Sequence, residues 1–129
     1  ELAAAEGESV PAWDAPDHLS ELSTWLGHHL GQWAQTGLII TLGAQGALAV
    51  TAHETVYVPA PTVPLVSAAG AGDAVAAGVM MGLRQGQSWA DALRLGVAAA
   101  AAVVTNEGTA VCTAQQVYAH LPNVHAVSI

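Results

Sequence analysis

The sequence contains almost no positive charge. Its 129 residues include no lysine and only two arginines, Arg84 and Arg94, against ten carboxylates, which gives a formal net charge of −8. A surface that binds nucleic acid or an anionic membrane neutralises phosphates with Lys and Arg side chains, so we expect neither partner. If the protein handles phosphate, backbone N–H groups and a metal ion must hold most of its charge.

Cysteine and long apolar runs are also scarce. The single cysteine, Cys112, cannot form an internal disulfide, and no CxxC pair or Cys/His cluster predicts structural zinc. The longest apolar run, residues 97–104, is too short to cross a membrane, and no signal peptide opens the chain. These absences favour a soluble protein of the reducing cytoplasm. Because the chain starts at Glu1 without an initiator methionine, we expect that upstream sequence has been removed.

Apolar residues make up 53% of the chain and charged residues 9%. This composition predicts a single folded domain rather than a disordered chain. Residues 1–16 predict a polar lead-in, either a loop or a short helix, and Asp17 is predicted to cap a helix that ends at Gly37. The apolar residues of this helix recur at the spacing of one helix face: Leu19, Leu22, Trp25, Leu26, Leu30 and Trp33.

Strands and further helices are predicted downstream. Residues 38–42 form a continuous apolar run, typical of a strand buried on both faces of a parallel sheet. Strands are also predicted at 47–51 and 56–58, after which three prolines keep the chain extended. We therefore expect an α/β fold of about four strands and four helices. The later helices are predicted from capping residues and apolar spacing at 73–86, 88–105 and 113–122.

One short segment has the composition of an anion site. Gly70-Ala71-Gly72-Asp73 stands where a loop leads into a helix, and small residues let the backbone turn tightly and approach a ligand. The first N–H groups of a helix have no partner within it and attract an anion. A carboxylate beside such a pocket can accept a proton from an attacking hydroxyl during phosphoryl transfer. The alternative is that Asp73 only caps the helix and the glycines only serve a tight turn.

Two motifs together resemble the ribokinase-like (PfkB) family of carbohydrate kinases. Residues 67–80 follow the family's second signature through Gly-Ala-Gly-Asp and again at Ala77-Gly78. The segment Thr41-Leu-Gly-Ala-Gln-Gly46 resembles the family's nucleotide loop, Thr-Leu-Gly-x-x-Gly. Both motifs stand in the family's order and at its usual separation. The resemblance runs from about Gly37 to Leu121 and implies a Rossmann-like, ribokinase-type three-layer fold.

The resemblance also implies roles for individual residues. Asp73 would be the catalytic base that takes the proton from a sugar hydroxyl, and Mg²⁺ would neutralise the phosphates of ATP. Glu1 would be the last residue of an upstream Asn-x-x-Glu element tied to magnesium. The remaining implied residues are Gly70, Ala71 and Gly72 with Asp73 as the anion hole, and Thr41, Gly43 and Gly46 along the nucleotide. The alanine-rich helix resembles the wall of the adenine site; at its end, Asn106 and Glu107 either contact the nucleotide or form a solvated helix terminus.

The chain also departs from the family pattern. Ser67 and Ala68 stand where many members have Asp and Thr; a serine cannot supply the aspartate's charge, so the resemblance does not extend to potassium activation. A serine there is similar to the branch that acts on sugar phosphates, such as 1-phosphofructokinases and tagatose-6-phosphate kinases. Members are well over twice as long, and their N-terminal part carries the sugar-binding residues and a β lid. We therefore expect residues 1–129 to be the C-terminal, nucleotide-binding portion, with a lead-in at 1–36 and the motif-bearing core at 37–121, and to be inactive alone.

The motifs and the resemblance predict ATP-dependent phosphorylation of a sugar or sugar phosphate. Family members often dimerise through the lid, so a homodimer of the full-length enzyme is what the resemblance implies, while the sequence itself leaves the oligomeric state open. The alternatives are a nucleoside kinase of the same family, a non-catalytic nucleotide-binding module and a structural fragment without a ligand. The six histidines show no metal-ligand spacing, and we expect them to serve packing or the surface. Trp25 and Trp33 share a helix face and are expected in the core, and Cys112 is expected to be inert.

Overall fold

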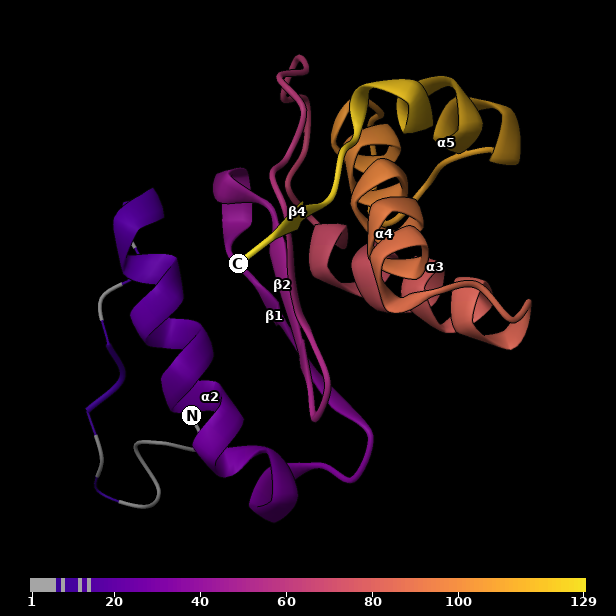
Figure 1. Ribbon diagram of the computed structural model, residues 1–129. Coiled ribbons are helices and arrows are strands. Elements are labelled where there is room, and N and C mark those ends of the chain that lie inside the picture. The colour runs from indigo at the N-terminus through magenta and orange to yellow at the C-terminus, as the bar shows by residue number, and fades with distance from the viewer. Residues whose placement is uncertain (1–6, 8, 12, 14) are drawn as a thin grey trace.

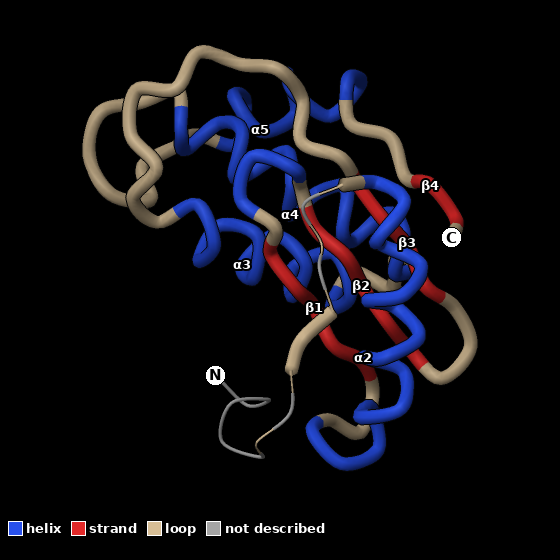
Figure 2. Tube along the Cα trace, turned by 90° about the vertical axis from the view of Figure 1, so that its left-hand side faces the viewer, coloured by secondary structure: helices blue, strands red, loops and turns tan. Residues whose placement is uncertain are grey.

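The structure is a computed structural model that describes residues 7, 9–11, 13 and 15–129. Glu1, which was predicted near magnesium, and most of the predicted lead-in lie outside these residues. Four strands form one sheet with the order β1-β2-β3-β4; Figure 2 shows them side by side. Helix α2 covers one face of this sheet and helices α3 and α4 cover the other, which makes three layers (Figure 1). In chain order the elements are the 3-10 turn η1 (Pro16–His18), α2 (Leu19–Trp33), β1 (Gly37–Thr41), η2 (Gly43–Gln45), β2 (Ala47–Thr51), β3 (Thr55–Val58), α3 (Ala71–Arg84), α4 (Trp89–Val104), α5 (Ala114–His120), η3 (Leu121–Asn123) and β4 (Val127–Ser128).

The sheet is antiparallel throughout, so the predicted parallel sheet is wrong. Gly37 pairs with Thr51 in the β1–β2 register, and Val56 pairs with Ser128 in the β3–β4 register. The connections after β1 and β2 are short turns, whereas a parallel pair needs a crossover of roughly a dozen residues. The apolar run in β1 misled the prediction because both faces of this antiparallel sheet are covered by helices.

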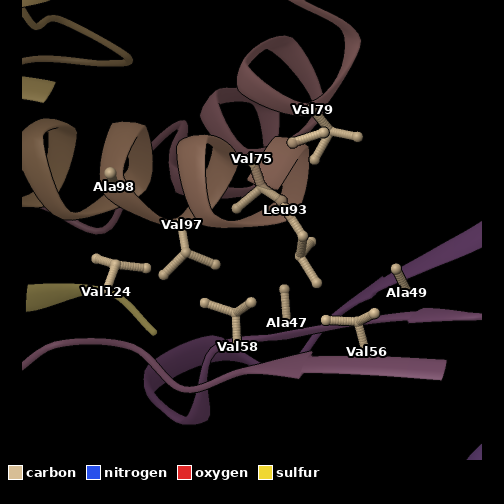
Figure 3. Close-up of a cluster of buried hydrophobic side chains, with 11 residues drawn as sticks. Ala47, Ala49, Val56, Val58, Val75, Val79, Leu93, Val97, Ala98 and Val124 are labelled. Carbon is tan, nitrogen blue, oxygen red and sulfur yellow. The ribbon is translucent and has the colours of Figure 1, made fainter. Parts of the chain in front are cut away.

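Alternate residues of each strand face opposite helical layers. In β2, Leu48 and Val50 pack with the leucines of α2, while Ala47 and Ala49 pack toward α3 and α4. Strand β3 continues the alternation, with Tyr57 on the α2 side. The resulting core between the sheet and the helices α3 and α4 is shown in Figure 3, where side chains of the helices point toward those of the strands.

The start and end of α2 differ from the prediction. Its N-cap is His18, without a side-chain cap, and Asp17 lies in the preceding η1 turn. The helix ends at Trp33 rather than at Gly37, which is the first residue of β1. A Cβ atom at Gly37 would lie 2.9 Å from the Trp89 ring of α4, so a larger residue here would have to displace the end of that indole. Trp25 and Trp33 are partly buried against the α2 core, as predicted, and His29 stacks on the Trp33 ring at 4.2 Å.

Helices α3 and α4 approach each other closely because glycines face each other across their contact. A Cβ atom at Gly78 would lie 2.6 Å from the Gly96 Cα atom, and one at Gly96 would lie 2.6 Å from the Val75 carbonyl oxygen. The predicted helix signals are confirmed at three places. Gly86, at φ +78°, follows the end of α3; the Ser88 side chain accepts a hydrogen bond from the Asp91 N–H; and Thr113 with Gln116 forms a full capping box.

Candidate active site

The two sequence motifs line one cavity of about 610 Å³. Its lining includes Thr41, Gly43 and Gly46 of the first motif together with Ala71 and Gly72 of the second. The inner face of α4 forms an apolar wall of the cavity through Val97, Ala100, Ala101 and Val104, and the role of this helix beside adenine stays a prediction. The cavity therefore joins segments from both halves of the sequence.

The loop of the first motif is shaped by its glycines. Gly46 has φ +107°, and a Cβ atom there would overlap the Val58 carbonyl oxygen, so only glycine fits. The Leu42 N–H donates to the Gly46 carbonyl at 2.8 Å, and the Gly46 N–H donates to the Gly43 carbonyl at 3.1 Å. These bonds join the two ends of the loop, and Thr41 and Gly43 line the cavity.

Tyr57 braces the same loop from the sheet. Its hydroxyl donates to the Gln45 carbonyl oxygen at 2.6 Å. Burial raises the pKa of the Tyr57 hydroxyl above its ordinary value, because the phenolate would be poorly solvated there. Sequence reasoning missed this contact, because Tyr57 was recognised only as one residue of an apolar strand.

The second motif presents unpaired N–H groups. Gly70 caps α3 in the left-handed conformation, with φ +82°. The Ala71 N–H donates to the Ala68 carbonyl at 3.3 Å, but within the described chain the N–H groups of Gly72 and Asp73 have no acceptor. Apart from its chain neighbours and the backbone of its own helix, nothing lies within 4 Å of the position that a Cβ atom at Gly72 would occupy, and Gly72 is exposed, so no other element covers this end of the helix. Unpaired N–H groups and the positive end of a helix dipole attract an anion.

Asp73 lies on the other side of this helix end. Its side chain is exposed and borders a second depression of about 390 Å³, between α3, α4 and α5, rather than the large cavity. Over the part of the chain that the structure covers, its carboxylate accepts no hydrogen bond and forms no ion pair, so it does not cap α3. The end of α3 thus separates Gly72, on the large cavity, from the Asp73 carboxylate, next to the second depression.

Asn106 does not line the large cavity. Its side-chain amide donates to the Gln116 side-chain oxygen at 2.9 Å and to the Val111 carbonyl at 3.0 Å. The predicted nucleotide contact of Asn106 stays a prediction. Sequence reasoning missed the extended segment after β3 as part of the site. This segment lines the cavity through Ala60, Pro61, Thr62, Val63 and Leu65. The prolines predicted the extended backbone but not the surface that it faces.

The two arginines are placed away from the large cavity's lining. Arg94 donates to the Val124 carbonyl at 2.7 Å and pairs with Asp91 at 3.1 Å. Arg84 is in the last turn of α3, about 16 Å from Asp73 along the helix axis.

The side chains that line the large cavity are small and apolar, with a few hydroxyl groups. Such a lining fits a flat, partly apolar group such as a nucleotide base, and it leaves the backbone N–H groups for the anionic end of the same ligand. Among the described residues no group of three or more His, Cys, Asp or Glu side chains could hold a metal ion, and none of the described helices is both long enough and apolar enough to span a membrane.

The fold and the cavity define a class of protein: three α/β layers with the N-terminus of a helix open beside an apolar cleft. A profile of the pfkB family carbohydrate kinases matches residues 13–116. The 1-phosphofructokinase of Haloferax volcanii is 38% identical to the chain over 130 residues, which cover 100% of this chain and 40% of the relative. The ATP-dependent 6-phosphofructokinase isozyme 2 of Mycobacterium tuberculosis is 40% identical over 80 residues, which cover 62% of this chain and 24% of the relative.

Solved structures agree with these relatives. The phosphofructokinase-2 of Escherichia coli in complex with potassium superposes with a TM-score of 0.75 at 28% identity, over 95% of this chain and 38% of that chain. The ribokinase of Thermotoga maritima has a TM-score of 0.70 at 28% identity, over 79% of this chain and 35% of that chain. The chain belongs to the pfkB family of carbohydrate kinases. It has the ribokinase-type fold in part, and it spans 40% or less of the length of the relatives named here.

Proposed function

We propose that the chain is the C-terminal, nucleotide-binding portion of a kinase that transfers a phosphoryl group from ATP to a hydroxyl of a sugar or sugar phosphate. One observation carries the proposal: the open N–H groups at the start of α3 lie beside a cavity that the Thr41–Gly46 loop also lines. Family membership supports the same reaction class. The names of the two relatives favour a sugar phosphate over a nucleoside as the acceptor.

In this proposal the anionic end of ATP lies against the start of α3. Gly70 sets the helix start, and the unpaired N–H groups of Gly72 and Asp73 stabilise the charge that develops on the transferred phosphoryl group. The Ala71 N–H, which was expected to join them, donates to the Ala68 carbonyl in this structure and must leave it to contact the phosphoryl group. Thr41, Gly43 and Gly46 line the nucleotide, whose base rests on the apolar wall of α4. Mg²⁺ supplies the positive charge that the cavity's side chains lack; it is commonly held by substrate phosphates with one or two carboxylates, so no larger protein cage is required.

Asp73 is the proposed general base. Its carboxylate is exposed, unpaired among the described residues and on the opposite side of the helix end from the large cavity. This placement suits a group that meets the acceptor while the N–H groups of the same turn meet the donor. Because the chain spans so little of its relatives' length, we propose that the acceptor-binding residues lie elsewhere in the complete kinase and that this portion alone is inactive. The cytoplasmic location and the homodimer that the resemblance implies stay predictions, and potassium activation is not part of the proposal.

Replacement of Asp73 tests the proposal in the complete kinase that contains this chain. A positioned base contributes about 10²- to 10⁴-fold to a rate. The substitution Asp73→Asn keeps the size of the side chain and removes its proton-accepting charge. We expect kcat to fall by that factor, while the affinity for ATP with Mg²⁺, measured by calorimetry, stays nearly the same.

Asp91→Asn provides a matched control, because Asp91 is an exposed carboxylate near the start of the neighbouring helix, α4. This variant should keep its kcat. Near-normal turnover in Asp73→Asn would remove Asp73 from the mechanism, and an equal loss in both variants would point to a general electrostatic effect.

A further inference from the structure

The loop between α4 and α5 is held by a pair of side-chain amides. Asn106 donates to the Gln116 side-chain oxygen at 2.9 Å, and the Gln116 side-chain N–H donates back to the Asn106 oxygen at 3.3 Å. Both residues are half-buried, and the bonds join positions on either side of the loop. Because the two bonds are reciprocal, each amide fixes the orientation of the other.

The same two side chains also bind the backbone of the loop. The Asn106 amide donates to the Val111 carbonyl at 3.0 Å, and the Gln116 oxygen accepts from the Thr113 N–H at 3.0 Å. Residues 107–112 are therefore held at their C-terminal end by contacts to both amides. The loop includes Ala110, whose φ of +54° lies in the left-handed region that residues other than glycine seldom adopt. Such a conformation persists where the surrounding contacts impose it.

Ala110 in turn lies directly against the start of α3. A Cβ atom at Gly70 would be 2.7 Å from the Ala110 Cβ atom, and the Ala110 N–H donates to the Ala69 carbonyl at 3.2 Å. On the other side of Asn106, the Val104 carbonyl accepts from the N–H groups of Val66 and Ser67, at 2.7 and 3.1 Å. The segment 104–110 thus contacts both ends of the loop that leads into the Gly-Ala-Gly-Asp turn.

We propose that Asn106 and Gln116 are positioning residues for the anion site: through residues 107–112 they hold Ala110 against Gly70 and so fix the direction of the N–H groups at the start of α3. This inference rests on the proposed function for the identity of the ligand, but the mechanical link concerns this chain alone. Neither side chain lines the large cavity. The pair acts through the backbone and needs no contact with nucleotide.

The test uses the 129-residue chain with three variants, Asn106→Ala, Gln116→Ala and Gln116→Glu. The glutamate keeps an acceptor for the Thr113 N–H and for the Asn106 amide, and loses only the donation back to Asn106. The matched control is Ser88→Ala, which removes the cap of α4, a local bond outside the 104–116 region. Two quantities are measured by NMR: the hydrogen exchange of the Ala110 N–H and the affinity for ATP with Mg²⁺ from shifts of the Gly72 and Asp73 N–H signals.

We expect both alanine variants to speed Ala110 exchange by about tenfold or more, since the loop opens locally without global unfolding. We expect ATP binding to weaken by about tenfold in the same variants, the usual effect of one hydrogen bond to a charged group. Gln116→Glu should lie between these variants and wild type. Ser88→Ala should lose thermal stability and leave both quantities unchanged.

The remaining outcomes separate the inference from the proposed function. Unchanged Ala110 exchange in both alanine variants overturns the positioning role. Weaker ATP binding in Asn106→Ala alone, with normal Ala110 exchange, also overturns it, because Asn106 would then contact the nucleotide directly. If wild type fails to bind ATP, the proposed function fails for this chain. Even in that case the alanine variants test the mechanical link. Faster Ala110 exchange together with shifted Gly72 and Asp73 N–H signals would support the link, whereas wild-type exchange together with wild-type signals would overturn it.

Discussion

At the scale of single residues, the candidate site is made mostly of backbone. Its central groups are the N–H groups of Gly72 and Asp73, which have no acceptor among the described residues, and its loops depend on glycines with positive φ. This agrees with the scarcity of cationic side chains. In a chain with two arginines, neither of them in the cavity lining, a phosphate bound there must be held mostly by backbone N–H groups and a metal ion.

Tyr57 gives a prediction at this scale that depends on pH. Because its pKa is raised in the folded state, the folded state binds the phenolic proton more tightly than the unfolded state, whose value is about 10. The stabilising contribution is complete below the unfolded pKa and is lost as the pH rises through the folded pKa. We expect chemical denaturation to show a steeper loss of stability above about pH 10 in wild type than in Tyr57→Phe.

Tyr57→Phe also removes the hydrogen bond to the Gln45 carbonyl, so at neutral pH it should be less stable by about 1 kcal/mol. The control is Tyr118→Phe, at an exposed tyrosine of α5. It should change neither the stability at neutral pH nor the loss of stability at high pH. Equal slopes for wild type and Tyr57→Phe above pH 10 would contradict the role given to burial.

At the scale of elements, the position of the anion site depends on the close contact of α3 and α4. Gly78 and Gly96 let the two backbones approach, and this approach places the start of α3 beside the α4 residues that form the cavity wall. A glycine inside a helix usually lowers its stability by about 1 kcal/mol relative to alanine. These glycines are therefore explained by the packing of two helices rather than by the needs of either one.

Two glycine substitutions should change the free energy of unfolding in opposite directions. Gly96→Ala would place a Cβ atom 2.6 Å from the Val75 carbonyl oxygen and 2.9 Å from the Val79 side chain, so we expect a loss of about 1–3 kcal/mol in the free energy of unfolding. Gly27→Ala, in α2, would meet nothing within 4 Å apart from its neighbours and its own helix backbone, so we expect helix propensity to raise the free energy of unfolding by about 0.5–1 kcal/mol. Denaturant melts of both variants measure the difference, and a stabilising Gly96→Ala would show that α3 and α4 can separate without loss.

At the scale of the whole molecule, the chain leaves an apolar surface uncovered. Met80 and Met81 on α3 are 71% and 54% exposed, and β1 is an edge strand of the sheet. In the complete kinase proposed above, we expect other residues to cover this surface. In the chain by itself, the same surface is available for self-association.

We therefore expect the isolated chain to self-associate with increasing concentration in analytical ultracentrifugation. Replacing both methionines, by Met80→Gln and Met81→Gln, should shift the equilibrium toward the monomer while the melting temperature stays nearly unchanged, because neither side chain is in the core. Ile129→Ser removes an exposed apolar side chain at the end of the sheet and serves as the control. A wild-type chain that stays monomeric at every concentration would contradict this account of the surface.

The sequence by itself determined the local features of this protein. Apolar spacing predicted α2, capping residues predicted the starts of α4 and α5, and the pattern Gly-Ala-Gly-Asp predicted an open helix start, because each depends on residues near in the chain. Only the tertiary structure decided the antiparallel sheet, the wall formed by residues 60–65, the brace from Tyr57 and the Asn106–Gln116 pair. These features depend on contacts between residues distant in sequence, and an apolar run reads alike in a parallel or an antiparallel strand once helices cover both faces.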